Sequence, residues 1–219
     1  MSWRLHSPKF LKGYWSLNSH VLDLSGNGNN GTWAGTEAYA DGPYGKSVGD
    51  FDESSYVDTG GNTNPSGVSG MTLTAIARAD VTDTNNAIMG WWDGTHGLFM
   101  ASHTGVEGLL VAAGVGTDYG EVACSILKYN FIALVYDGLA TGNAERLKLY
   151  VNGELQSLTF NGAAAIPATL PTYSDTDMHI GALPTLGRRW NGKISKSKVY
   201  NVALTQDEII KLGRIDRRS

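Results

Sequence analysis

The fold is indicated most strongly by two neighbouring stretches, YNFIALVYDG (129–138) and RLKLYVNGEL (146–155). The first is apolar at nearly every position, which is typical of a central strand that is covered on both faces. The second alternates leucine and valine with lysine and tyrosine, and a period of two indicates a strand. It then reaches Asn152-Gly153, which favours a type I′ hairpin because both turn residues need positive φ. We therefore expect an antiparallel hairpin with 153–160 as its return strand.

Strand patterns continue along most of the chain. TLTAIARA (72–79) alternates in the manner of a half-buried strand, and HIGAL (179–183) and ISKSKVYNVAL (194–204) are also expected as strands. Turn residues recur about every ten positions, and GGNTNPSGVSG (60–70) is expected as a long loop rather than a linker. The sequence therefore predicts an all-β domain, a two-layer antiparallel sandwich.

One helix is expected, near the C-terminus. Thr205 can cap it, Glu208 completes a capping box three residues later, and Leu212 belongs to its apolar side. Gly213 is expected to end the helix. We expect this short helix to cover one end or edge of the β body.

Composition limits the partners that the protein can take. The chain has 219 residues and a formal net charge of −4, so nucleic acid is not favoured. A basic arm (1–12) and a basic tail (214–219) are expected to flank a domain of residues 13–213. They are either solvated or form an electrostatic contact with a neighbouring protein. Cys124 is the only cysteine, so an intrachain disulfide is excluded. We expect its side chain to be a small buried apolar group.

Targeting signals are not recognisable in the chain. Met1 leads into polar residues rather than a signal segment, and no apolar run is long enough for a bilayer. If the protein works outside a cell, we expect lysis, a virion or a longer parent protein to place it there.

Several stretches, in order, resemble laminin G-like modules of the concanavalin A-like superfamily. They are GYWSLN (13–18), DLSGNGNNGT (23–32), FDESSYVDTG (51–60), MTLTAIARA (71–79), the 129–155 pair, and WNGKISKSKVYNVALTQDEI (190–209). The resemblance implies a jelly-roll sandwich. Many members bind carbohydrate or protein surfaces through loops at one rim, and some relatives cleave glycans, so the fold alone does not decide the function.

The loop DLSGNGNNGT is similar to loops that lie beside a calcium ion in such modules. The resemblance implies Asp23 as the anionic ligand, with Asn27 and Asn29 adding oxygens. The alternative is a structural turn, since Asn and Gly tolerate left-handed backbone angles. The closing strand of many relatives carries acidic residues where this chain has Ser195 and Lys196, which favours the turn.

The segment GWWDGTHG (90–97) is the first candidate recognition surface. Trp91 and Trp92 are adjacent on an expected strand and must face opposite ways. One ring can then reach the rim and stack on a sugar, with Asp93 and His96 binding hydroxyl groups. The alternative is that the second ring packs beneath a loop.

RRWNG (188–192) is the second candidate. Arg188 and Arg189 flank Trp190 on one side, and arginine suits an acidic sugar or an acidic protein surface. A solvated turn is the alternative. Tyr119, on an expected loop tip, is a third candidate. Lys196 and Lys198 are expected to point outward and protect an exposed strand edge.

Catalytic patterns are weak. Asp50 and Asp52 alternate and can share a face, and further carboxylates are Glu53, Asp175 and Asp177. None forms the E-x-D-x-x-E pattern of related glucanases, and the histidines lack zinc-ligand spacing. We expect a non-catalytic module that binds a glycan or cell-surface polysaccharide, with a polysaccharide hydrolase or lyase as the alternative. The same glycan-binding module could also be a component of a bacteriophage virion, in contact with capsid or tail proteins.

Overall fold

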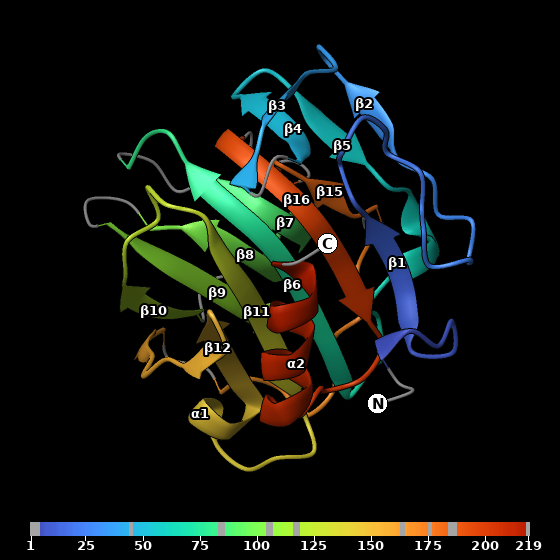
Figure 1. Cartoon of the computed structure of the whole chain (residues 1–219). Helices are drawn as coiled ribbons and strands as arrows, with labels where there is room; N and C mark the ends of the chain where they lie inside the picture. Colours follow the sequence, from blue (N-terminus) through green and yellow to red (C-terminus); the bar gives the residue numbers. More distant parts are fainter. Residues whose placement is uncertain are drawn as a thin grey trace.

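Two antiparallel sheets lie face to face in the computed structural model (Figure 1), as the alternating sequence predicts. The structure describes residues 5–43, 46–82, 86–103, 107–115, 119–162, 165–174, 177–183 and 188–217. No helix within these ranges is long and apolar enough to cross a membrane.

The first sheet has the strand order β13-β12-β11-β6-β16-β4-β3, and β1 also pairs with β16. Its strands are β1 (Leu11–Trp15), β3 (Tyr39–Asp41), β4 (Ser47–Asp52), β6 (Gly70–Ala79), β11 (Asn130–Asp137), β12 (Leu147–Val151), β13 (Glu154–Leu155) and β16 (Asn191–Tyr200). β4 pairs with the first half of β16 and β1 with the second half.

The second sheet has the order β14-β10-β9-β8-β7-β15-β5-β2. Its strands are β2 (Thr32–Ala34), β5 (Tyr56–Asp58), β7 (Ala87–Trp92), β8 (His96–Ser102), β9 (Gly108–Val115), β10 (Tyr119–Ala123), β14 (Thr159–Asn161) and β15 (His179–Ile180). The named helical segments within the described residues are η3 (Gly61–Thr63), α1 (Asn143–Arg146) and α2 (Gln206–Asp216), and α2 follows the last strand.

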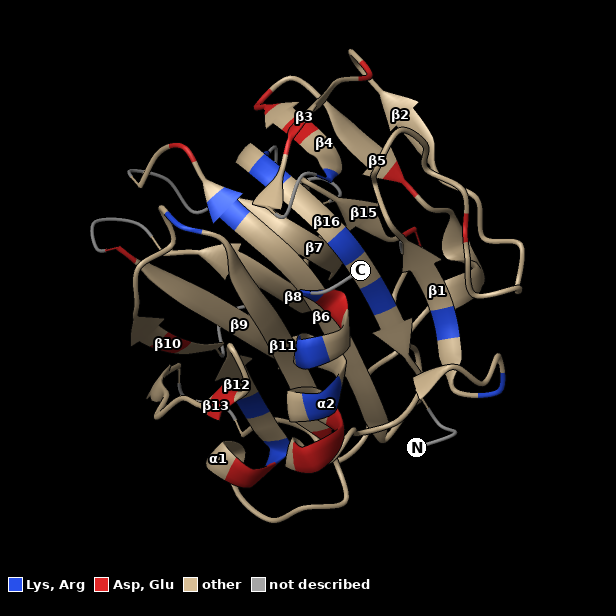
Figure 2. Cartoon of the chain, viewed as in Figure 1, with Lys and Arg blue, Asp and Glu red and all other residues tan. Residues whose placement is uncertain are grey.

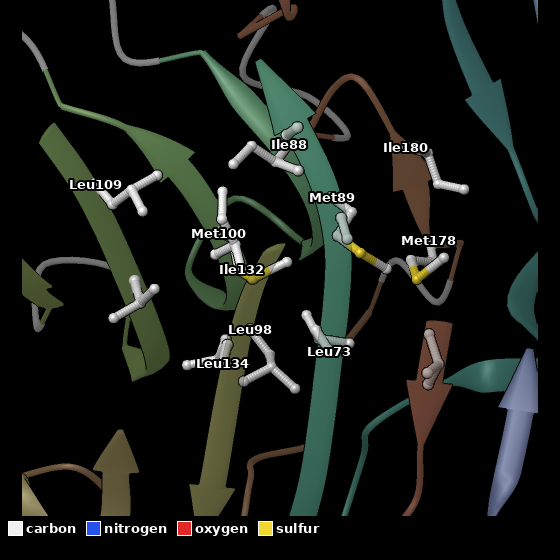
Figure 3. Packing of buried hydrophobic residues seen from close by; sticks show 14 of the residues in the cluster. Leu73, Ile88, Met89, Leu98, Met100, Leu109, Ile132, Leu134, Met178 and Ile180 are labelled. Carbon is white, nitrogen blue, oxygen red and sulfur yellow. The ribbon is translucent and has the colours of Figure 1, made fainter. Parts of the chain in front are cut away.

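The main core lies between the two sheets. Figure 3 shows Leu73, Ile132 and Leu134 of the first sheet meeting Leu98 and Met100 of the second. All of these side chains are 2% exposed or less. Burial of such side chains is the main favourable term that holds the layers together.

The predicted hairpin is confirmed at its turn. Asn152 has a φ of 56° and Gly153 a φ of 92°, as a type I′ turn requires. The return strand was predicted too long. Only Glu154 and Leu155 pair with β12, and the chain then crosses to the second sheet, where Thr159–Asn161 pairs with β10.

Helix α2 lies across the outer face of the first sheet (Figure 1), so the expected position at an end or edge is wrong. Its apolar side covers Phe131 of β11 and Ile76 of β6. β11 is therefore buried on both faces, as predicted. β6 is also buried on both faces, so the prediction of a half-buried strand is wrong. The alternation of polar and apolar residues in 72–79 could not reveal that a helix far along the chain covers the outer face.

The capping box of α2 is present: Thr205 and Glu208 satisfy each other's backbone N–H groups. The helix does not end at Gly213 but continues to Asp216. A Cβ at Gly213 would lie 2.8 Å from Cδ1 of Phe131, so this glycine allows the helix to approach the sheet closely.

Residues next to the expected termini belong to the packed fold. Leu5 is 1% exposed and its carbonyl accepts a hydrogen bond from the Tyr200 hydroxyl. Asp216 is buried in α2. Within the described residues, the domain therefore extends beyond both expected boundaries, at 12/13 and 213/214.

The prediction that Lys196 and Lys198 protect an edge is wrong, because β16 is an interior strand. Figure 2 shows that several positions along β16 are basic. Lys198 is 4% exposed, and its Nζ lies 2.5 Å from Oδ1 of Asp216. A bulge between Ser195 and Lys198 interrupts the pairing with β6.

Candidate functional site

Both tryptophans of the β7–β8 hairpin are buried. Trp91 enters the main core with no exposed surface, and Trp92 is 9% exposed. Trp92 does face the other side of the second sheet, where it packs edge-to-face on Phe99 with ring centroids 6.0 Å apart. The expectation of an open ring for sugar stacking is therefore wrong, and the alternative of a covered ring holds.

Asp93 and His96 hold the turn between β7 and β8. The Asp93 carboxylate accepts hydrogen bonds from the backbone N–H groups of Thr95, His96 and Ser174. Burial raises the pKa of Asp93, but the bonds from His96, Ser174 and Thr95 outweigh it and hold the pKa well below its usual range. His96 Nδ1 lies 3.3 Å from the same carboxylate. These two side chains are thus committed to the protein itself.

Tyr119 lies on β10 rather than on a loop tip. It is half-buried and packs against the apolar cluster that contains Trp92, Phe99 and Leu183. Cys124 is half-buried against the main core, and burial raises the pKa of its thiol to about 11. The thiol is therefore protonated at neutral pH, as expected of an inert cysteine.

The segment 188–190 returns along 181–183. Trp190 N–H donates to the Gly181 carbonyl, and Ala182 forms a bridge with Arg189. The arrangement buries Trp190 to 1% exposure, whereas Arg188 and Arg189 stay partly exposed. Of the three residues predicted here, only the arginines can therefore meet a ligand.

Arg189 is held by two contacts. Its Nη1 donates to the Ser54 carbonyl at 3.0 Å, and its guanidinium carbon lies 5.5 Å from the centroid of the Tyr56 ring. Tyr56 in turn stacks on His179, with ring centroids 4.5 Å apart and planes tilted by 32°. The stack orients the guanidinium before any ligand arrives.

Strand alternation places these groups on one face. Val57 and Ile180 point into the core, so their neighbours Tyr56, Asp58 and His179 lie on the outer face of the second sheet. We call Tyr56, Asp58, His179 and Arg189 the Arg189 patch. Sequence reasoning identified Arg189 but missed the other three, because β5 and β15 are more than a hundred residues apart.

The patch leaves polar groups available for a ligand. Arginine has five N–H donors, and within the described residues the Arg189 side chain donates one hydrogen bond, to the Ser54 carbonyl. No carboxylate forms an ion pair with it among the residues that the structure describes. Asp58 uses one oxygen to accept the Gly60 N–H at 2.8 Å. A fixed guanidinium can bind a carboxylate, and a carboxylate on the same face of the sheet can accept a hydrogen bond from a hydroxyl group.

The predicted metal residues form a tightly bonded turn instead. Oδ1 of Asp23 accepts the N–H groups of Tyr14 and Ser25, and Oδ2 accepts the Asn29 N–H and the Ser25 hydroxyl. The Asn27 side chain donates to the Leu11 carbonyl at 2.7 Å. This donor set does not fit calcium, because four protein donors already occupy the only carboxylate.

Other acidic groups are also paired. Lys193 Nζ lies 3.0 Å from Asp50 and 2.6 Å from Asp80, and Asp52 accepts hydrogen bonds from Ser54. Asp175 lies outside the described residues. Within them, no three His, Cys, Asp or Glu residues group as metal ligands.

A family model described as the concanavalin A-like lectin/glucanases superfamily (Laminin_G_3) matches residues 51–210. The chain belongs to this family. A search of curated protein sequences found no significant match.

Solved structures share the fold at low identity. Domain 4 of AbnA, a GH43 extracellular arabinanase from Geobacillus stearothermophilus solved with arabinotriose, has a TM-score of 0.68 and 18% identity; the match covers 93% of this chain and 98% of that domain. The binding domain of Paraclostridial Mosquitocidal Protein 1 has a TM-score of 0.68 and 15% identity, covering 93% and 52%. A structure of botulinum neurotoxin type C, whose cell entry depends on two ganglioside molecules, has a TM-score of 0.63 and 11% identity, covering 94% and 51%.

The chain thus spans about half the length of the two toxin chains and nearly all of the arabinanase domain. At these identities the likeness concerns the fold alone.

Proposed function

We propose that this protein is a non-catalytic glycan-binding module and that the Arg189 patch takes an acidic sugar. The observation that carries the proposal is a guanidinium with a fixed orientation and no carboxylate partner among the described residues. Lectin-like jelly rolls bind ligands on their outer faces and rims, and the Arg189 patch lies on an outer face.

The chemistry favours a sugar with one carboxylate. Two parallel N–H···O bonds from Arg189 match a carboxylate group, and Oδ2 of Asp58 can accept a hydrogen bond from a sugar hydroxyl. Asp58, together with exposed Glu53 nearby in sequence, disfavours polyanions such as sulfated glycans and nucleic acid. Uronic and sialic acids meet these conditions.

Fold relatives that are binding domains support the proposal. Domain 4 of the arabinanase was solved with arabinotriose, and the binding domain of botulinum neurotoxin DC, a further structure of similar fold, was solved with SialylT. Catalysis is not favoured by the patch, because Asp58 is its only carboxylic acid and glycoside hydrolysis usually needs two.

A glycan array with matched acidic and neutral glycans tests the function. We expect binding to glycans that end in a uronic or sialic acid. Arg189→Ala should weaken it about 10-fold to 100-fold, the range for a hydrogen bond to a charged group. Arg189→Lys should restore it only in part, because lysine lacks the planar fork. Exposed Arg214 in α2 supplies the control, Arg214→Ala.

Three results would contradict the proposal. If no glycan on the array binds, the glycan-binding function is wrong. If an acidic protein binds through Arg189 instead, the module is a protein-binding one. Release of reducing ends or unsaturated sugars from a polysaccharide would replace it with an enzyme.

The virion setting rests on the sequence alone. We retain it as a proposal with capsid or tail proteins as partners, on a virion or another extracellular surface. Mass spectrometry of purified particles from a phage that encodes the chain tests it, and absence from the particles would overturn it.

A further inference from the structure

A polar groove of about 490 Å³ opens where β1 and β6 begin and β16 ends. Its lining is unusual in holding five asparagines: Asn27, Asn29, Asn62, Asn64 and Asn201. None of its lining residues is acidic, and Lys12 is its only charged one. The groove has the size of a small-molecule site and is distinct from the Arg189 patch.

The first wall is the 23–30 loop, which Asp23 holds rigid. Asn29 Nδ2 donates to the Lys12 carbonyl at 2.6 Å, and Asn27 Nδ2 donates to the Leu11 carbonyl at 2.7 Å. Within the described residues, the Oδ1 atoms of these two asparagines accept no hydrogen bond. This wall therefore offers acceptors whose positions are already set.

The second wall is the 60–70 loop. Oδ1 of Asn64 accepts the N–H and the hydroxyl of Ser66, which leaves its Nδ2 as a donor. Asn62 is exposed and forms no side-chain hydrogen bond with a described residue. Gly67 N–H donates to the Leu170 carbonyl at 3.0 Å and fixes the loop. This wall therefore adds donors to the groove.

Thr63 also lines the groove, but it is 3% exposed and its Oγ1 is covered by protein atoms, so this hydroxyl does not face a ligand. Val68 and Met71 complete the lining with apolar surface.

We propose that this groove is a second, independent site that binds a neutral sugar. Sugar hydroxyls both donate and accept, and the amides of the two walls present both functions. The apolar lining, Val68 and Met71, receives the C–H face of the ring. Neutral sugars fit better than acidic ones, because only Lys12 offers charge.

The test uses the full chain and three neutral probes: maltotriose, cellotriose and xylotriose. Asn62→Ala is the cleanest variant, since its side chain supports no part of the fold. We expect the dissociation constant, measured by NMR titration, to rise about 2-fold to 10-fold, the range for one neutral hydrogen bond. Asn161→Ala on β14, outside the groove, is the matched control and should leave it unchanged.

The outcomes distinguish this proposal from the one above. Neutral-sugar binding that is weakened in Asn62→Ala but unchanged in Arg189→Ala supports the groove. No shift with any of the three trisaccharides, or a shift that Asn62→Ala leaves unchanged, overturns it. Acidic binding through Arg189 can stand or fail separately in either case.

Discussion

Removing Lys198 should destabilise the protein strongly, because its partner Asp216 would remain buried and charged. The side chains of the pair are 5% and 1% exposed, and Nζ lies 2.5 Å from Oδ1. Oδ2 of Asp216 has no hydrogen-bond partner among the described residues, and Lys196 interacts with this carboxylate only through charge, so Lys198 is its one direct ionic partner in this part of the chain. Lys198→Met should therefore lower the free energy of unfolding by about 3–5 kcal/mol.

The pair itself contributes much less than this loss suggests. Desolvation of two ions offsets most of their attraction, so replacing both partners with apolar residues of similar volume is often neutral or stabilising by about 1–4 kcal/mol. We expect Lys198→Met/Asp216→Leu to recover most of the stability that Lys198→Met loses. Tyr14, whose ring centroid lies 4.5 Å from Nζ, remains available to pack on the methionine.

Urea denaturation followed by tryptophan fluorescence measures both variants. Each 1 kcal/mol also shifts the melting temperature of a domain of this size by about 2–4 °C, so calorimetry gives an independent reading. Lys211→Met on α2 is the control for a lysine that stays partly exposed. A loss below about 1 kcal/mol for Lys198→Met, or a double variant as unstable as the single one, would refute the reasoning.

Three further predictions concern single side chains. Asp93→Asn should lower stability at neutral pH, and because folding depresses the pKa of Asp93, the difference from wild type should begin to shrink below about pH 4 and keep shrinking toward the depressed folded pKa in pH-dependent thermal melts; a constant difference would contradict this. Asp23→Ala should cost about 2–4 kcal/mol through its four lost hydrogen bonds, and millimolar calcium should not raise the melting temperature of the wild type; a rise would restore the metal site. Gly213→Ala should destabilise by about 1–3 kcal/mol despite the better helix propensity, since the Cβ meets Phe131 at 2.8 Å; a more stable variant would show that the helix can shift.

Local patterns predicted the elements that local forces specify. The type I′ turn at Asn152-Gly153 and the capping box at Thr205 depend on a few neighbouring residues, and both are present. The doubly covered strand β11 followed from its apolar run. These features need no knowledge of what lies across the sandwich.

The predicted recognition residues failed for the opposite reason. Alternation required Trp91 and Trp92 to face opposite ways, which is correct, but it could not say that the outer face beneath Trp92 is covered as well. Lys198 appeared to be a surface lysine until α2, which follows it in the chain, placed Asp216 against it.

The amino-acid sequence by itself determined that this chain forms strands, where one hairpin turns and how its helix starts, because backbone preferences and short-range hydrogen bonds decide those features. Only the tertiary structure decided which faces stay open. It brought Tyr56, His179 and Arg189 together across the second sheet, and it set Asn62 and Thr63 opposite Asn27. The physical reason is that a site is made by strand order and layer packing, which join residues that no local pattern connects.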